Sequence, residues 1–294
     1  MSPDISESGT KIPAALSGVA ETLLISLAAR AADAASPDPI LGDPYAKATL
    51  DKLEYDAQRV RLSLLDAGGV ALRTRQLDQW TASFLHDHPC CTVLHLACGL
   101  DSRMQRVDWG SDVRWIDVDL PEVIALRQRI MPTSLPERDY LLVGARVTDK
   151  AWLEGIPADR PTIIVMEGLL SYLMEEDVET LLSRLVDRFG EGELLFECIN
   201  STVLASLQKR NLKSVEQTGA AFHWAVDDLS KVRELHPNLD LLEAICFPEA
   251  PGVDHFPVRR RVLLYLMSWV PSLRESARFV RFGFGPRAVS GTRD

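Results

Sequence analysis

The chain has 294 residues, 46% of them hydrophobic, and its 32 basic and 42 acidic residues give a formal net charge of −10. This composition is typical of a globular protein with a substantial core, and it excludes disordered and fibrous classes. The acidic balance disfavours nucleic acid and anionic membranes as partners, and the longest apolar run, around residues 262–270, is too short to span a bilayer.

The first third of the chain is predicted to be helical. Residues 1–12 are polar and lack the apolar block of a signal peptide, so we expect a disordered N-terminus and a cytoplasmic protein. The spacing of apolar residues predicts helices over 14–35, 45–65 and 70–85. The first of these helices is closed by Pro37 and Pro39.

From residue 89 onward, strand-like and helical patterns alternate. Short β-rich runs cover 91–97, 113–118, 140–143, 162–166 and 193–198, and a helical pattern covers 177–189. This alternation predicts an α/β fold with a doubly wound, mostly parallel sheet and helices on both faces. Two later runs, 239–247 and 261–270, are predicted to be antiparallel edge strands. Since no linker divides the chain, we expect one domain over 13–284 and a flexible tail over 285–294.

The cysteines give no sign of a disulfide framework or a metal site. They are odd in number and scattered, so we expect free thiols, and no metal is predicted anywhere in the chain. They are Cys90, Cys91, Cys98, Cys198 and Cys246.

Two residues follow predicted strands at the place where doubly wound sheets bind ligands. Gly99 comes after the first strand, and it would let a ligand approach the backbone without meeting a Cβ atom. Asp119 comes after the second strand, about twenty residues later, where an acidic side chain can accept hydrogen bonds from the two hydroxyls of a ribose. The alternatives are a structural turn at Gly99 and a helix cap at Asp119 ahead of Pro121.

Three ordered segments carry a resemblance to a known family. They are residues 94–103 (LHLACGLDSR), 115–123 (WIDVDLPEV) and 165–173 (VMEGLLSYL). Together they resemble the leucine carboxyl methyltransferase family, including its branch of TcmP-like O-methyltransferases that act on small molecules. The resemblance runs from about residue 22 to residue 229. It implies a class I methyltransferase with a Rossmann-like core over 89–284, a helical lid over 13–88, and S-adenosylmethionine as the cofactor.

The resemblance also implies roles for individual residues around the methyl donor. Arg73, within residues 71–78 (ALRTRQLD), matches the arginine that holds the donor's carboxylate, a task suited to the paired donors of a guanidinium. Gly99 matches the glycine against the methionine moiety, Asp119 the ribose-binding acid, and Glu167 the acid opposite the donor's amino group. A surface arginine on a helix is the alternative for Arg73.

Five further residues complete the predicted site. Ala97 and Val147 are expected to contact the donor. Tyr172 matches a tyrosine that borders the substrate pocket and is expected to position the acceptor, with a core aromatic as the alternative. Arg30 falls in the implied lid and is expected to face the substrate. His223 is expected either to line that pocket or to belong to a packed aromatic cluster.

The sequence departs from the family pattern at two positions. Ala97 stands where the family usually has a glycine, so the turn must tolerate a Cβ atom there. In residues 144–149 (GARVTD), Arg146 stands where an aspartate usually accepts a hydrogen bond from the adenine amino group, which an arginine cannot do. Either Asp149 or a backbone carbonyl takes that role, or donor binding is weakened.

The acceptor is the least determined part of the prediction. We expect methyl transfer to a carboxylate or hydroxyl of a small, polyketide-like metabolite. A carboxylate is already ionised and needs no base, whereas a phenol or alcohol needs one, and no histidine is marked for that role. The alternatives are methylation of a protein's C-terminal carboxylate, and a methyltransferase fold that serves as a cyclase or a binding scaffold.

Overall fold

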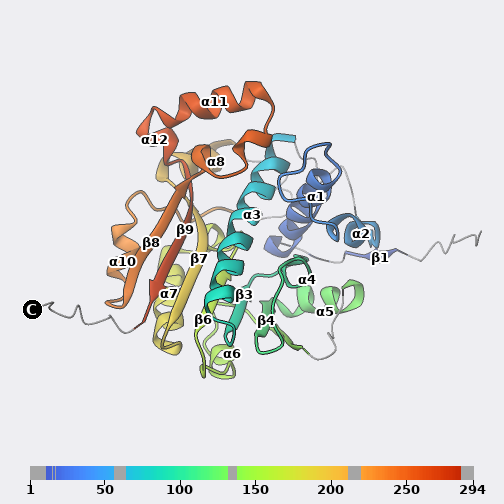
Figure 1. Ribbon diagram of the computed structural model, residues 1–294, viewed down its shortest axis with the longest axis vertical. Helices are drawn as coiled ribbons and strands as arrows, with labels where there is room; N and C mark the ends of the chain where they lie inside the picture. The colour runs from blue at the N-terminus through green and yellow to red at the C-terminus, as the bar shows by residue number, and fades with distance from the viewer. Residues whose placement is uncertain are drawn as a thin grey trace, which may run out of the picture.

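The computed structural model describes residues 11–14, 16, 18–55, 64–131, 138–210 and 220–285. At its centre is a seven-stranded sheet in the order β5-β4-β3-β6-β7-β9-β8 (Figure 1). Neighbouring strands among the first five in this order are parallel, which confirms the predicted α/β fold with a mostly parallel sheet. These strands are β3 (Thr92–Leu96), β4 (Arg114–Asp119), β5 (Asp139–Gly144), β6 (Thr162–Met166) and β7 (Gly192–Ile199).

The order of the parallel strands places a crevice beyond the carboxyl ends of two neighbouring strands. From β3 the chain moves outward through β4 to β5, and it then returns to β6 on the other side of β3. The direction of winding therefore reverses between β3 and β6. At such a reversal the connections from two neighbouring strands diverge, and this leaves an opening beyond their carboxyl ends.

Two helices cover opposite faces of the sheet. α3 (Leu64–Asp87) crosses one face in the foreground of Figure 1, and α7 (Glu175–Arg188) lies on the other. Because successive strand residues point to opposite sides, Val93 packs in the cluster that contains α3, and Leu94 packs in the cluster that contains α7. A third cluster joins α5 (Pro121–Ile130) to the N-terminal helices.

The N-terminal region differs from the prediction in its details. η1 (Gly18–Thr22) and α1 (Leu23–Ala34) match the first expected helix, but the helix predicted over 45–65 is wrong. α2 (Ala46–Asp51) ends early, and β2 (Leu53–Glu54) pairs in parallel with β1 (Ile12–Pro13), so order begins before residue 13. Leu53 is fully buried against α1 and α5, which favours the extended conformation there. Residues 56–63 lie outside the described residues.

The C-terminal region contains one confirmed edge strand and one error. β8 (Leu239–Cys246) is an edge strand as predicted, but the strand predicted over 261–270 is wrong, because this segment belongs to helix α11 (Val258–Ser268). β9 (Ala277–Phe284) lies between β7 and β8, antiparallel to both. This strand is not predicted from the sequence, although the alternating apolar residues of β9, which include Val280 and Phe282, are a strand signal.

Several shorter elements connect these parts. They are α4 (Arg103–Arg106), α6 (Ala151–Glu154), η2 (Leu170–Tyr172), α8 (Ser201–Arg210), α10 (Ser230–Glu234), η3 (Phe247–Glu249), η4 (Val253–His255) and α12 (Pro271–Arg274). Within the described part of the chain, no helix has the length and apolar content that crossing a membrane requires. All five cysteines are free thiols, as expected.

Candidate active site

A cavity of about 310 Å³ lies beyond the carboxyl ends of β3, β4, β5 and β6. Residues of η1 and α1, including Leu23, Ser26 and Arg30, form its opposite side. Most of the predicted site residues border it, namely Arg30, Arg73, Ala97, Gly99, Asp119, Val147, Glu167 and Tyr172. His223 does not, because its side chain is exposed and only its backbone N–H approaches the site, donating to the Ser171 carbonyl at 2.8 Å.

The loop after β3 forms the floor of the cavity in a left-handed conformation. Gly99 has a φ of 50°, and a Cβ atom there would lie 3.3 Å from Cβ of Leu23. Ala97 has a φ of 52° and is the only non-glycine residue with a positive φ in the described ranges. That conformation costs an alanine roughly 1–2 kcal/mol, so the loop retains local strain at Ala97. Arg127 supports the loop by donating to the carbonyl oxygens of Gly99 at 3.0 Å and Asp101 at 2.7 Å.

Asp119, at the end of β4, ties two backbone segments together. Its Oδ2 accepts the Gly99 N–H at 2.7 Å, and its Oδ1 accepts the Leu120 N–H at 2.7 Å. Burial raises the pKa of Asp119, and these two hydrogen bonds oppose the rise. A carboxylate can accept about four hydrogen bonds, so this side chain retains capacity for the hydroxyls of a ligand.

Glu167, directly after β6, is held by two arginines and a hydroxyl. Arg73 Nε donates to its Oε1 at 3.0 Å, Thr74 Oγ1 donates to the same oxygen at 2.7 Å, and Arg103 Nη2 donates to Oε2 at 2.5 Å. Burial alone would raise the pKa of Glu167, but the two guanidinium groups outweigh it and lower this pKa to about 2. Glu167 therefore presents a permanent negative charge to the cavity.

Glu197, near the end of β7, was not identified from the sequence. Its Oε1 accepts the Gly168 N–H at 2.7 Å and a hydrogen bond from Arg73 Nη1 at 3.2 Å. Its Oε2 is buried and has no hydrogen-bond partner. Burial raises the pKa of Glu197 to about 7, since Arg73 only partly offsets burial and the neighbouring Glu167 repels a second negative charge. Arg73 thus holds two carboxylates of contrasting proton affinity.

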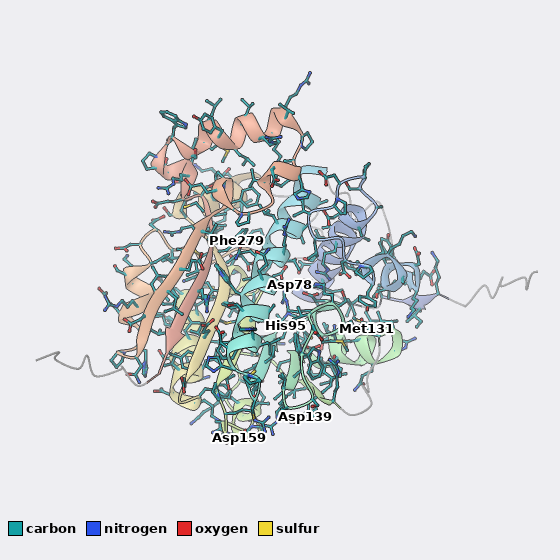
Figure 2. The ribbon with its side chains drawn as sticks, in the orientation of Figure 1. Asp78, His95, Met131, Asp139, Asp159 and Phe279 are labelled. Atoms are coloured by element: carbon teal, nitrogen blue, oxygen red, sulfur yellow. The ribbon has the colours of Figure 1, made fainter. Side chains whose placement is uncertain are left out.

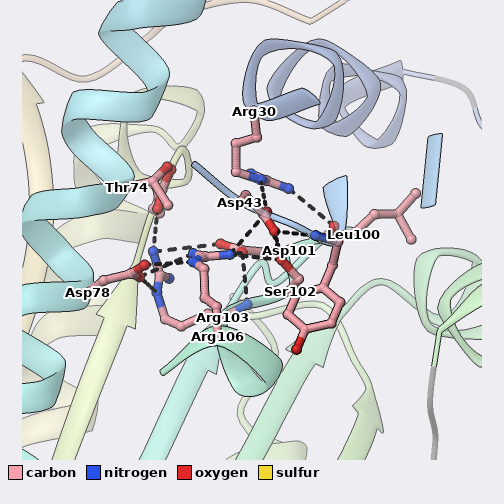
Figure 3. A network of polar contacts seen from close by, with 12 residues as sticks. Arg30, Asp43, Thr74, Asp78, Leu100, Asp101, Ser102, Arg103 and Arg106 are labelled. Atoms are coloured by element: carbon pink, nitrogen blue, oxygen red, sulfur yellow. Dashed lines mark hydrogen bonds and ion pairs between the residues drawn. The ribbon is translucent and has the colours of Figure 1, made fainter. Parts of the chain in front are cut away.

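Behind Glu167 lies a network of buried charges, shown in Figure 3. Asp78 on α3 accepts from Arg103 Nε at 2.6 Å and from Arg106 Nε at 2.6 Å. Arg106 Nη1 also donates to Asp101 at 2.5 Å. Burial would raise the pKa of Asp101, but the surrounding arginines, with Arg106 the foremost, hold it well below its usual value. The network connects α3 to the loop after β3.

The same network extends into the N-terminal region and the middle of the sheet. Arg30 on α1 lies 3.4 Å from Asp43 and donates to the Leu100 carbonyl at 3.1 Å, so the predicted substrate residue already has protein partners. Arg103 Nη1 lies 2.9 Å from Nε2 of His95 on β3. Figure 2 shows His95 and Asp78 at the centre of the molecule, where α3 crosses the sheet.

The loop after β5 forms another part of the wall. Val147 is buried there, whereas Arg146 is exposed and borders the cavity. Asp149 is exposed and does not border the cavity. Asp177, in the first turn of α7, does border it and was not identified from the sequence.

Tyr172 lies in an aromatic pair at the rim of the cavity. Its ring is stacked on Phe222, with 4.8 Å between the ring centroids, and its side chain is hydrogen-bonded to Thr22. Burial raises the pKa of Tyr172. This tyrosine is therefore neutral at physiological pH and can act by contact but not as a base. Trp224 packs nearby against Phe196, with 6.2 Å between the ring centroids, so the packed aromatic cluster that was the alternative for the His223 region is present here and contains Trp224.

Comparison with known proteins shows which family the chain belongs to. The profile of the family described as leucine carboxyl methyltransferase matches residues 23–186. The chain is 40% identical to the tetracenomycin polyketide synthesis O-methyltransferase TcmP of Streptomyces glaucescens over 92% of this chain and 98% of that protein. It is 37% identical to the S-adenosyl-L-methionine-dependent methyltransferase dpfgK of Gibberella zeae, over 78% of this chain and 82% of that protein.

Solved structures agree with this fold at low sequence identity. A DUF574-family protein from Streptomyces avermitilis superposes with a TM-score of 0.59 at 15% identity, covering 88% of this chain and 97% of the other. A putative methyltransferase from Thermobifida fusca superposes with a TM-score of 0.57 at 16% identity, covering 92% of this chain and 96% of the other. Both support a Rossmann-like methyltransferase fold.

Proposed function

The chain belongs to the leucine carboxyl methyltransferase family, and from that premise we propose that it methylates an oxygen atom of a small, polyketide-like acceptor. It is an S-adenosylmethionine-dependent methyltransferase, as its relatives are. The observation that supports the proposal most directly is the position of Arg73, Asp119 and Glu167 around one cavity at the strand reversal. When bound, S-adenosylmethionine supplies a methyl group on a positively charged sulfur, so the protein needs mainly to align the reactants and exclude water.

The chemistry of the cavity wall suits each part of this donor. Arg73 is placed to bind the carboxylate of the methionine moiety, and the permanently ionised Glu167 is placed to accept its ammonium group. Asp119 offers its remaining lone pairs to the ribose hydroxyls. Ala97, Gly99 and Val147 supply the close contacts with the backbone and apolar side chains. The implied lid is formed by η1 and α1, whose residues border the cavity opposite the strands.

We further propose that Asp177 accepts the hydrogen bond from the adenine amino group. It borders the cavity together with Arg146 and Val147, whereas Asp149 does not. A carboxylate from α7 would then replace the one that the loop after β5 lacks. We expect Asp177→Asn to weaken binding of S-adenosylhomocysteine about tenfold, measured by titration calorimetry, because an amide accepts more weakly than a carboxylate. Asp149→Asn is the matched control, and an equal loss in both variants would contradict the assignment.

A carboxylate is the acceptor that the cavity suits better. A hydroxyl acceptor needs a base, but Glu167, with its pKa of about 2, is too weak a base, and the pKa of Tyr172 is raised so that this side chain stays protonated. His95 borders the cavity, but its Nε2 faces the guanidinium of Arg103. Glu197 has a suitable pKa of about 7, but it does not border the cavity. A carboxylate acceptor is already ionised, so alignment past the Tyr172–Phe222 pair suffices.

A methyl-transfer screen against aromatic acids and phenols, with products detected by mass, tests the proposed reaction. At saturating S-adenosylmethionine, we expect carboxylate acceptors to form methyl esters at a rate that changes little between pH 6.5 and 8.5. Phenols as the sole acceptors, with rates that rise with pH, would overturn the carboxylate assignment. Absence of any donor binding at millimolar S-adenosylmethionine would overturn the whole assignment of the cavity. We propose a cytoplasmic location for this reaction, supported by the five free thiols.

A further inference from the structure

The outer side of α11 and α12 exposes an unusual amount of apolar surface. Eight large hydrophobic residues there are between 41% and 71% exposed, whereas hydrophobic residues on the surface of a monomer are normally scattered singly. We call this surface the α11 face. It consists of Val258, Val262, Leu263, Tyr265, Leu266, Trp269, Val270 and Leu273. Monomeric proteins seldom expose an apolar patch of this size.

The helix itself makes little contact with the rest of the protein. Leu264 is the only residue of α11 that is buried, and Figure 1 shows the helix at the upper margin of the molecule, away from the sheet. On a helical projection Val262, Leu266 and Trp269 point away from Leu264. The apolar stripe on this outer side is therefore broader than the inner one, which is the reverse of the pattern for a surface helix of a monomer.

The charges of α11 suit a partner of defined orientation. Arg259 and Arg261 lie in its first turn, are exposed, and have no acidic partner among the described residues. Positive side chains at a helix N-terminus are unfavourable, because that end of the helix dipole is also positive. A second copy of α11 packed antiparallel would bring its negative C-terminal end to these arginines, and the same contact would form twice by symmetry.

We propose that the α11 face is the interface of a symmetric homodimer. Eight large exposed hydrophobic side chains and an antiparallel charge arrangement suit a self-complementary interface, and a standard interface buries roughly 800 Å² on each partner. The inference is independent of the reaction, since the face is built by residues outside the cavity.

Sedimentation velocity of the full chain between 1 and 100 µM tests the dimer. We expect a dimer in the wild type and a monomer for Leu266→Glu at the centre of the face. Leu241→Glu, at a site on β8 that is 42% exposed, is the matched control and should remain dimeric. Circular dichroism and binding of S-adenosylhomocysteine verify that each variant is folded. A wild type that is monomeric at 100 µM would overturn the proposal, and so would a dimeric Leu266→Glu. If the wild type is monomeric and binds phosphatidylglycerol vesicles, the α11 face is a lipid-binding surface instead.

Two glutamates share the guanidinium of Arg73, and a donor carboxylate would compete with them for it. Its Nε is bonded to Glu167 and its Nη1 to Glu197, so both edges of the guanidinium already face carboxylates. A third carboxylate can bind with two parallel hydrogen bonds only if one of these glutamates gives up its place. Glu167 is also held by Arg103 and Thr74, whereas Glu197 has no other side-chain partner among the described residues.

We propose that Glu197 is a positioning residue that holds Arg73 ready for the donor's carboxylate and takes up one proton from the buffer when the donor binds. The proposal rests on the proposed binding of that carboxylate at Arg73. The proton goes to Oε2 of Glu197, which is buried and has no hydrogen-bond partner. A neutral Glu197 removes the repulsion between two carboxylates that share one arginine.

The neighbours of Glu197 favour proton uptake near neutral pH. The side chain faces Arg73 on α3, Glu167 in the loop after β6, and Tyr172 on η2. With the pKa of Glu197 at about 7 before binding, a further negative charge at Arg73 raises it above the pH of the solution. Glu167, with its pKa of about 2, stays ionised and available to the ammonium group of the donor.

Titration calorimetry with S-adenosylhomocysteine at pH 8, in phosphate and in Tris, measures this proton. We expect the apparent binding enthalpy to differ between the buffers by an amount equal to uptake of 0.5 to 1 proton, and the difference to vanish in Glu197→Gln. Glu191→Gln, at the exposed residue immediately before β7, is the control and should behave as wild type. Tight binding with no buffer dependence in the wild type would overturn this inference while leaving the proposed function intact. Absence of binding would instead overturn the proposed function.

Discussion

The buried charges that line the cavity and extend behind it, here called the charged wall, and the apolar layers on the two faces of the sheet are both buried. Different interactions stabilise the two regions. In the layers, residues such as Leu94 and Leu182 fill space against α7, and their contribution does not depend on which apolar neighbour they meet. In the wall, Arg103 is fully buried and is stable there only because Asp78, Glu167 and His95 surround its guanidinium. The layers therefore tolerate local change, whereas loss of a fully buried charge from the wall leaves its partners undercompensated.

The largest expected effect comes from breaking the wall at its centre. Arg103→Met should lower the free energy of unfolding at pH 7 by about 3–5 kcal/mol, because the buried carboxylates of Asp78 and Glu167 each lose one of their two guanidinium partners. Leu182→Ala, in the apolar layer, should cost about 2–5 kcal/mol. Urea denaturation at pH 7 and pH 4 distinguishes the two variants. The cost of Arg103→Met should shrink at the lower pH, where the abandoned carboxylates take up protons, and that of Leu182→Ala should not.

Removing a residue from the cavity side of the wall should affect binding more than stability. Arg73→Ala is expected to weaken binding of S-adenosylhomocysteine about 10- to 100-fold, in line with about 1.5–3 kcal/mol for a charge-assisted hydrogen bond. Arg75→Ala, two residues along the same helix, is the control, since Arg75 does not border the cavity and its Nη1 bonds the Ile40 carbonyl. Unchanged affinity in Arg73→Ala, measured by calorimetry, would show that the donor's carboxylate binds elsewhere.

Glu197 gives the wall a dependence on pH that the apolar layers lack. Its folded-state pKa of about 7 exceeds the ordinary value of 4.5, so the folded protein binds the proton more tightly than the unfolded chain. Stability contributed by this group is therefore present below pH 4.5 and is lost as the pH rises to 7. We expect Glu197→Gln to raise the free energy of unfolding by about 2 kcal/mol at pH 8 and to change it little at pH 4. Equal effects at both values would contradict the burial of a titrating carboxyl group.

The smallest expected effect tests the strain in the floor of the cavity. Ala97→Gly should raise the free energy of unfolding by about 0.5–1 kcal/mol, because relief of the left-handed strain exceeds the added entropy of the unfolded chain. Ala145→Gly, at a cavity position without a positive φ, should lower it instead. Thermal unfolding of the two variants at pH 7 provides the measurement. Destabilisation in both would mean that the loop is not strained at Ala97.

The sequence by itself determined the layers of this protein. Alternating apolar residues in β3 and the helical spacing in α7 specify which faces are buried, because burial depends on the period of one segment and not on its partners. The same argument located Gly99 and Asp119 at strand ends, and the family resemblance added Glu167. It failed at residues 261–270, where a run of apolar residues fits either period, and at 45–65, where burial of Leu53 in a β-bridge overrides helix propensity.

Only the tertiary structure decided the charged wall. Asp101 and Arg103 both lie in the segment 94–103, which carries part of the family resemblance. Nothing in their spacing shows that Asp78 and Glu167, from distant segments, contact Arg103. Glu197 and Asp177 likewise carry no local signal. The energy of a buried charge depends on the distance and orientation of partners that the fold brings together, whereas the energy of a buried methyl group depends mainly on its removal from water.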